Sequence, residues 1–154
     1  YTNFTYWTQH CWGVTCVNDM EAMLSYQPIT IGDKEQALAD LVRCYEKMMM
    51  RSHTNGGYVN LLDECWKMCE KFHTNIVIMY DHVSCKNVGG LHGLFEDQAR
   101  ERGIHLIWIP HDVMDPRTVS RREMREAFSQ YMVTVLNEKP LDPTLLDYED
   151  TLSW

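Results

Sequence analysis

The sequence predicts an α/β fold built on an open parallel sheet with helices on both faces. Two apolar runs, residues 76–80 and 104–109, are continuous rather than alternating, which is typical of strands covered on both faces. A helical pattern over residues 91–102 connects them. A strand–helix–strand unit of this length forms a right-handed crossover between parallel strands. We therefore expect a flavodoxin-like sheet.

Length and composition are those of one globular domain. The chain has 154 residues, 45% of them hydrophobic, and a net charge of −8. We assign residues 1–140 to one α/β domain and residues 141–154 to an acidic tail that docks on a neighbouring surface. The negative charge argues against a nucleic acid or an anionic membrane surface as partner. No apolar run has the length of a membrane span and no signal peptide is visible, so we expect a cytoplasmic protein.

The first half of the chain carries two strong helical patterns. Residues 1–12 suit an early helix, and the β-branched residues 14–17 predict a short strand. Asp33 then opens a helix with Gln36 three residues on, an arrangement that caps a helix start. A second helix follows over residues 58–72. Each helix has an apolar stripe that we expect to be core: Leu38, Leu41, Val42, Tyr45, Met48 and Met49 in the first, and Tyr58, Leu61, Leu62, Cys65, Met68, Cys69 and Phe72 in the second.

The cysteines predict reduced thiols. Six of them are scattered among helix and strand patterns, not set in a loop-rich framework: Cys11, Cys16, Cys44, Cys65, Cys69 and Cys85. Cys65 and Cys69 have the i, i+4 spacing that can share a metal ion. Both lie inside the apolar stripe with no His or carboxylate beside them on it, so we expect core packing there.

The second half of the chain continues the α/β pattern. A polar loop with glycines, residues 82–90, follows the first apolar run, and Gly103 closes the helix after it. Ser120 caps the last helix, with Glu123 three residues on as in a capping box. The stripe of that helix consists of Met124, Ala127, Phe128, Tyr131, Met132, Val135 and Leu136.

Polar side chains follow both predicted strands at their carboxyl ends, where open α/β sheets bind ligands. They are His82, Cys85, Lys86, His111, Asp112, Asp115 and Arg117. A cysteine at a helix start loses its proton easily and suits a soft metal or a cluster, or serves as a nucleophile beside a histidine. The alternatives are a small buried Cys in a tight turn, capped or solvent-facing histidines, and aspartates that hold Arg117.

Several common motifs are absent from the sequence. Gly89, Gly90 and Gly93 do not form a G-x-G-x-x-G fingerprint, which argues against a dinucleotide site. No P-loop, H-E-x-x-H or G-x-S-x-G occurs.

Three segments resemble the carboxyl-terminal part of the 2-hydroxyacyl-CoA dehydratase and benzoyl-CoA reductase family. Residues 82–86 match its H-x-x-C-K loop, residues 100–109 its R-E-x-G-I-P-x-L strand, and residues 112–117 its D-x-x-D-x-R loop, in the same order. His105 stands where the family usually has proline. The resemblance runs from about residue 80 to 138, and more loosely back to residue 14.

The resemblance implies that Cys85 is one of three cysteines that hold a [4Fe–4S] cluster. The other two would belong to a preceding domain or chain, so this chain is expected to be a carboxyl-terminal portion of a longer subunit. His82 and Lys86 would lie near the cluster. A helix start beside Cys85 would stabilise the added negative charge of the reduced cluster. Three thiolates leave one iron open to substrate oxygen.

The implied reaction is removal of water from a (R)-2-hydroxyacyl-CoA through a ketyl radical, which gives an enoyl-CoA. The implied partners are a second dehydratase subunit, an ATP-dependent iron–sulfur activator that delivers one electron, and the acyl-CoA substrate. A benzoyl-CoA-type reductase subunit, a cluster-free structural subunit and a thiol enzyme are the alternatives.

Overall fold

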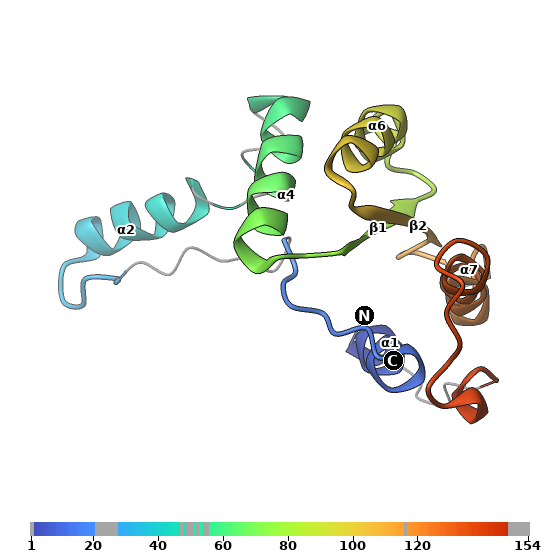
Figure 1. The fold of residues 1–154 in the computed structure, drawn as a ribbon. Helices are drawn as coiled ribbons and strands as arrows, with labels where there is room; N and C mark the ends of the chain where they lie inside the picture. The colour runs from blue at the N-terminus through green and yellow to red at the C-terminus, as the bar shows by residue number, and fades with distance from the viewer. Residues whose placement is uncertain are drawn as a thin grey trace. The chain divides into compact units, whose positions relative to one another are not determined.

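The computed structural model describes residues 2–20, 28–46, 48, 51, 53, 56–115 and 117–147. Two compact units make up the chain: Tyr1–Cys16 with Asn75–Trp154, and Val17–Thr74. The first unit is mixed α/β and contains a two-stranded parallel sheet (Figure 1). The α/β class predicted from the sequence is therefore confirmed. Within the described ranges, no helix is long and apolar enough to cross a membrane.

The sheet of the α/β unit consists of β1 (Ile76–His82) and β2 (His105–His111). They pair in parallel, from Ile76 opposite His105 to His82 opposite His111. The connection runs through α5 (Lys86–Gly89) and α6 (His92–Arg102). Gly103, at φ 65°, ends α6 in the left-handed conformation that glycine adopts without strain. The predicted strand–helix–strand unit is confirmed.

Helices cover both faces of this sheet. Ile107 and Ile109 of β2 are buried in one cluster with α1 (Thr2–Trp12) and α7 (Arg121–Thr134). Trp108, which points to the opposite face, contacts Phe95 of α6 edge-on. This alternation is what a pleated strand requires when both of its faces are covered.

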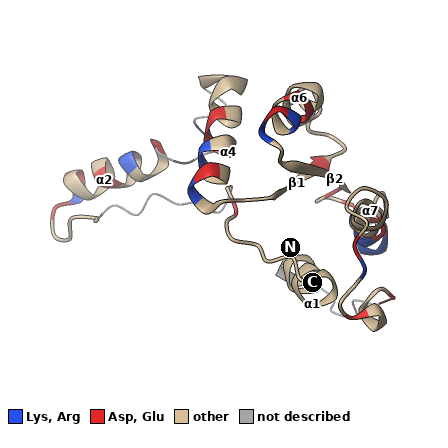
Figure 2. Cartoon of the chain, viewed as in Figure 1, with Lys and Arg blue, Asp and Glu red and all other residues tan. Residues whose placement is uncertain are grey.

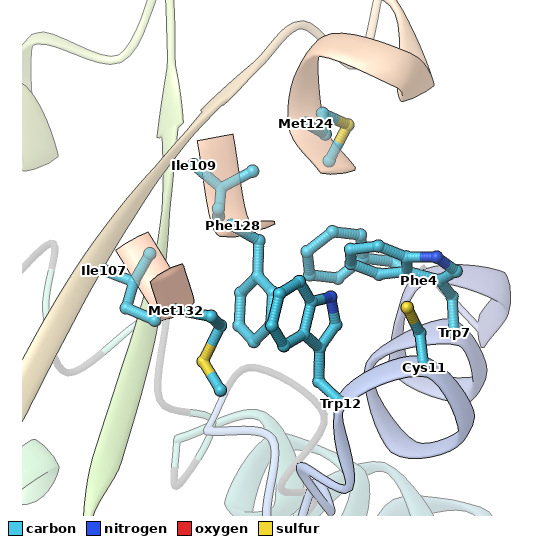
Figure 3. Packing of buried hydrophobic residues seen from close by; sticks show 9 residues of the cluster. All are labelled: Phe4, Trp7, Cys11, Trp12, Ile107, Ile109, Met124, Phe128 and Met132. Carbon is cyan, nitrogen blue, oxygen red and sulfur yellow. The ribbon is translucent and has the colours of Figure 1, made fainter. Parts of the chain in front are cut away.

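The core of the unit is aromatic and is centred on Phe128 of α7, which is fully buried. Three rings of α1 surround it edge-on, with centroid distances of 5.9, 5.8 and 6.4 Å for Phe4, Trp7 and Trp12 (Figure 3). Edge-to-face pairs at these distances are favourable because ring edges are positive and ring faces negative. α1 carries no Lys, Arg, Asp or Glu (Figure 2), which suits its buried position.

The start of the tail contacts α1. The Leu141 N–H donates to the Cys11 carbonyl over 2.7 Å, and the Trp7 Nε1–H donates to the Leu145 carbonyl, in the short helix η1 (Pro143–Leu145), over 2.8 Å. Residues 148–154 lie outside the described part. The division into residues 1–140 and 141–154 stays a prediction.

The strand predicted for residues 14–17 is wrong. These residues have no regular secondary structure. The Val14 N–H donates to the Thr8 carbonyl and thereby closes the end of α1, while the Val14 side chain packs against the aromatic core. Residues 14–17 are too few to form a stable strand by themselves, and they instead form the segment that follows the end of α1.

The second unit contains α2 (Lys34–Glu46) and α4 (Tyr58–Phe72). Of the predicted stripe of α4, Leu61, Leu62, Cys65 and Cys69 are buried, whereas Tyr58 and Phe72, the first and last residues of the helix, are exposed and contradict the prediction. The stripe of α2 contradicts the prediction, because Leu38, Leu41, Val42 and Tyr45 are exposed. Met49 lies outside the described residues.

The one buried residue of α2 is Asp40. Its carboxylate accepts hydrogen bonds from the Thr30 N–H and hydroxyl, the Gln36 amide and Arg43. Hydrogen bonds to Thr30 of the preceding loop and to two residues of α2 itself, not the apolar stripe, thus accompany the buried side of this helix.

Candidate functional site

The two strand ends meet at one edge of the sheet, as the sequence predicted. His82 and His111 are the last paired residues of β1 and β2, and their rings lie edge-to-face with centroids 5.7 Å apart. The Val83 N–H donates to the His111 carbonyl over 3.0 Å and so carries the pairing one residue beyond β1. The loop that bears Cys85 therefore starts from a fixed point on β2.

Cys85 lies at the end of a tight turn that begins at His82. The Cys85 N–H donates to the His82 carbonyl over 2.8 Å. The Ser84 N–H donates to His82 Nδ1 over 3.1 Å. Cys85 forms no disulfide, is half-buried and is the residue directly before α5. The thiol is thus presented at the sheet edge by a hydrogen-bonded turn.

The helix that follows Cys85 differs from the prediction. Residues 86–89 form the short helix α5, and the longer α6 begins only at His92. A helix of four residues has a small dipole, so the expected electrostatic support for a charged group on Cys85 is weaker than predicted. Lys86 is exposed in the first turn of α5.

The acidic residues after β2 build their own loop. Asp112 Oδ1 accepts from the N–H groups of Met114 and Asp115, over 2.9 and 3.2 Å. These bonds hold the pKa of Asp112 below its usual range. Asp115 binds Arg117 through both carboxylate oxygens, at 2.9 and 2.8 Å. The alternative in which the aspartates cap a loop and hold Arg117 is therefore confirmed.

His111 is the most buried polar group at this edge, with 9% of its surface exposed. Burial lowers its pKa, the neighbouring His82 lowers it further, and Asp112 acts in the opposite direction. The Tyr80 ring lies 5.5 Å from the His111 ring, centroid to centroid. His111 thus packs against Tyr80 and His82 at the strand ends.

Sequence reasoning missed one contact that positions α6. The His92 ring stacks on Trp108 with centroids 3.6 Å apart, and His92 Nε2 lies 3.4 Å from Asp81 Oδ1. His92 is the first residue of α6, and Asp81 directly precedes His82. An acidic residue near a strand end followed by a histidine at a helix start was the available signal.

Cys11, the buried cysteine of the same unit, lies in the aromatic core and not at the edge that carries Cys85. Cys11 is fully buried in the aromatic core, and its thiol donates to the Asp142 carbonyl over 3.5 Å. Burial, and then the charge of Asp142, raise the pKa of Cys11, which disfavours the thiolate that binds iron. The described part of the chain contains no group of three His, Cys, Asp or Glu residues placed to hold a metal ion.

The one-cysteine donor set tests the fit of an iron–sulfur cluster. Cys85 suits one ligand position because it is an undisulfided, half-buried thiol at an open sheet edge. A full set would need further thiolates from elsewhere.

A cavity lies away from Cys85. It has a volume of about 400 Å³, is lined by residues such as Ala99, Gly103 and Tyr131, and lies at the start of β2, which is the opposite end of the strand from Cys85.

Comparisons of this chain with family models, curated proteins and solved structures find no match.

Proposed function

We propose that this chain is the carboxyl-terminal cluster-binding domain of a 2-hydroxyacyl-CoA dehydratase subunit, in which Cys85 is one of three cysteine ligands of a [4Fe–4S] cluster. The observation that carries the proposal is the position of Cys85. It lies at the edge where both parallel strands end, in a turn tied to β2. That edge is where open α/β sheets bind ligands, and the loop has the H-x-x-C-K sequence of that family.

Only one of the two described strands has a free edge that suits pairing with a further strand, and this supports the flavodoxin-like form of the fold. The His105 N–H donates to the carbonyl of Asn75, the residue directly before β1. Bonding direction alternates along a strand, so the backbone of Pro110 points away from β1. Proline has no N–H, and within sheets it is confined to edge strands or bulges. β2 is then the edge strand.

β1 has the opposite character. It contains no proline, and the backbone groups of Ile76 and Ile78 point away from β2 by the same alternation. In the described part of the chain β1 pairs with β2 alone. In a flavodoxin-like sheet the last strand along the chain lies at an edge and the strand before it has neighbours on both sides. β1 and β2 suit these two positions.

The residues of the chain would bind and orient the cluster. When bound, the cluster would lend one electron to the thioester carbonyl of the substrate and take it back after the 2-hydroxyl group and a β-proton have been lost as water, so that the reaction is redox-neutral overall. Cys85 would hold one iron, and the turn from His82 would fix the direction of its thiol. Lys86, exposed beside it, would offset negative charge. The remaining thiolates would come from another domain or chain of a cytoplasmic complex.

The proposed partners are a second dehydratase subunit, an ATP-dependent iron–sulfur activator and an acyl-CoA. A benzoyl-CoA-type reductase subunit shares the three segments and is the alternative enzyme. A structural subunit without a cluster is favoured by a different observation, the exposed apolar stripe of α2, which suits pairing with another chain.

The proposal is tested by activity of the complex that co-purifies with this chain. With activator, ATP and a 2-hydroxyacyl-CoA, we expect enoyl-CoA to form in the wild type and in Cys16→Ala, and not in Cys85→Ala. Cys16 is an exposed thiol on a different segment and so is the matched control. Reduction of an aromatic acyl-CoA without elimination of water would favour the reductase. Equal activity of the two variants would contradict the proposed role of Cys85.

A further inference from the structure

We propose that His82 is a positioning residue whose Nδ1 atom, as a hydrogen-bond acceptor, sets the turn that carries Cys85. The value of this turn for a cluster rests on the proposed function, but the turn itself does not. Three hydrogen bonds define it: Ser84 N–H to His82 Nδ1, Cys85 N–H to the His82 carbonyl, and Val83 N–H to the His111 carbonyl.

The contact with Ser84 fixes the tautomer of His82. A backbone N–H can only donate, so Nδ1 must carry a lone pair and cannot carry a proton. In the neutral ring the proton then lies on Nε2. The same side chain that holds the turn therefore keeps one donor, Nε2–H, for a further partner.

The geometry is that of a side-chain turn. An Asn or Asp side chain commonly accepts a hydrogen bond from the backbone N–H two residues on, which mimics a backbone turn. His82 and Ser84 have this spacing. The side-chain bond and the backbone bond from Cys85 share one residue, so together they fix both peptide groups before the thiol.

A neighbouring ring holds the His82 ring in the orientation that this bond requires. The His111 ring lies edge-to-face against it, with ring centroids 5.7 Å apart. His111 is buried, so its ring has little freedom to move away from His82. The ring of His82 is thus confined on the side of β2 while its Nδ1 faces Ser84.

Two substitutions of similar shape distinguish the role of Nδ1 from that of Nε2 in His82. The Asn side-chain oxygen lies about where Nδ1 lies in histidine, and the Gln side-chain end lies about where Nε2 lies. We expect His82→Asn to keep the turn, and His82→Gln and His82→Ala to lose it. His105→Ala is the matched control, because His105 is an exposed histidine at the other end of the sheet.

The first readout is amide hydrogen exchange of Ser84, followed by NMR on the full 154-residue chain. Losing one ordinary hydrogen bond predicts exchange faster by roughly 3- to 10-fold in His82→Ala and His82→Gln, with His82→Asn and His105→Ala close to wild type. Unchanged exchange in His82→Ala, or rescue by Gln rather than Asn, would overturn the proposal.

The second readout is the rate at which a chelator removes iron from the anaerobically prepared complex. Loss of a group that orients a metal ligand predicts about 10-fold faster release in His82→Ala, restored by Asn. Equal release rates in all variants would refute the link between the turn and the ligand. If the wild-type complex holds no iron, the proposed function fails, while the exchange measurement still decides the role of His82.

Discussion

His82 is the residue on which the Cys85 edge depends, because its carbonyl and its ring both accept hydrogen bonds from the turn. The sequence predicted that His82, Cys85 and His111 meet at one edge, since parallel strands end together. It could not predict the hydrogen bond from Ser84 to Nδ1, because that bond depends on a ring orientation set by His111. Local sequence thus located the site, and tertiary contacts decided its geometry.

The lowered pKa of His111 predicts acid sensitivity. Its folded pKa lies below the ordinary 6.5, so the unfolded chain takes up the proton first as the pH falls. The contribution to stability is present above pH 6.5 and is lost from there down to the folded pKa. We expect His111→Gln to flatten this part of the curve of unfolding free energy against pH, measured by urea unfolding.

A second histidine sets the control for that experiment. Burial also lowers the pKa of His53, in the other unit, so part of the slope should persist in His111→Gln. His105→Gln, at an exposed position, should leave the whole slope in place. An unchanged slope in His111→Gln would show that the folded protein does not disfavour protonation of His111.

The helices show which sequence signals were sufficient to predict where a helix starts and which of its faces is buried. Ser120 and Glu123 form the predicted capping box at the start of α7, with bonds of 3.2 Å from the Glu123 N–H and 2.6 Å to its carboxylate. α5 was missed because one helical turn has no periodicity to detect. The stripe of α2 was misjudged because spacing alone does not show what covers a face, and Asp40 found four hydrogen-bond donors.

The capping box predicts a measurable loss of unfolding free energy when its serine is replaced. Ser120→Ala removes the acceptor for the Glu123 N–H and should lower the free energy of unfolding by about 1 kcal/mol. Ser129→Ala, within the same helix, is the matched control and should change it by less than about 0.5 kcal/mol. Thermal unfolding of both variants checks this, and equal effects would mean that the cap does not contribute.

Burial predicts a large loss of unfolding free energy when one leucine is replaced by alanine and a small loss when another is replaced. Leu62 on α4 is 4% exposed and Leu41 on α2 is 40% exposed. Leu62→Ala should cost about 2–5 kcal/mol of unfolding free energy, because it leaves a cavity. Leu41→Ala should cost less than about 1 kcal/mol. A large loss in Leu41→Ala would show that the α2 stripe is covered in solution.

At the scale of the whole molecule, the sequence predicted the α/β class and the order of β1, α6, β2 and α7. The continuous apolar runs were sufficient for this because both faces of the sheet are covered. It did not predict that α1 supplies Phe4, Trp7 and Trp12 to the core, because residues 2–12 show no clear helical period. Long-range packing around Phe128 gives those residues their place.

The central claim is that Cys85 is a ligand of an iron–sulfur cluster, and iron and acid-labile sulfide content tests it most directly. The measurement is made on the complex prepared without oxygen, for wild type, Cys85→Ala and Cys16→Ala. We expect iron and sulfide in the wild type and in Cys16→Ala, with most of both lost in Cys85→Ala. A wild-type complex without iron, or a Cys85→Ala complex that retains all of it, would contradict the claim.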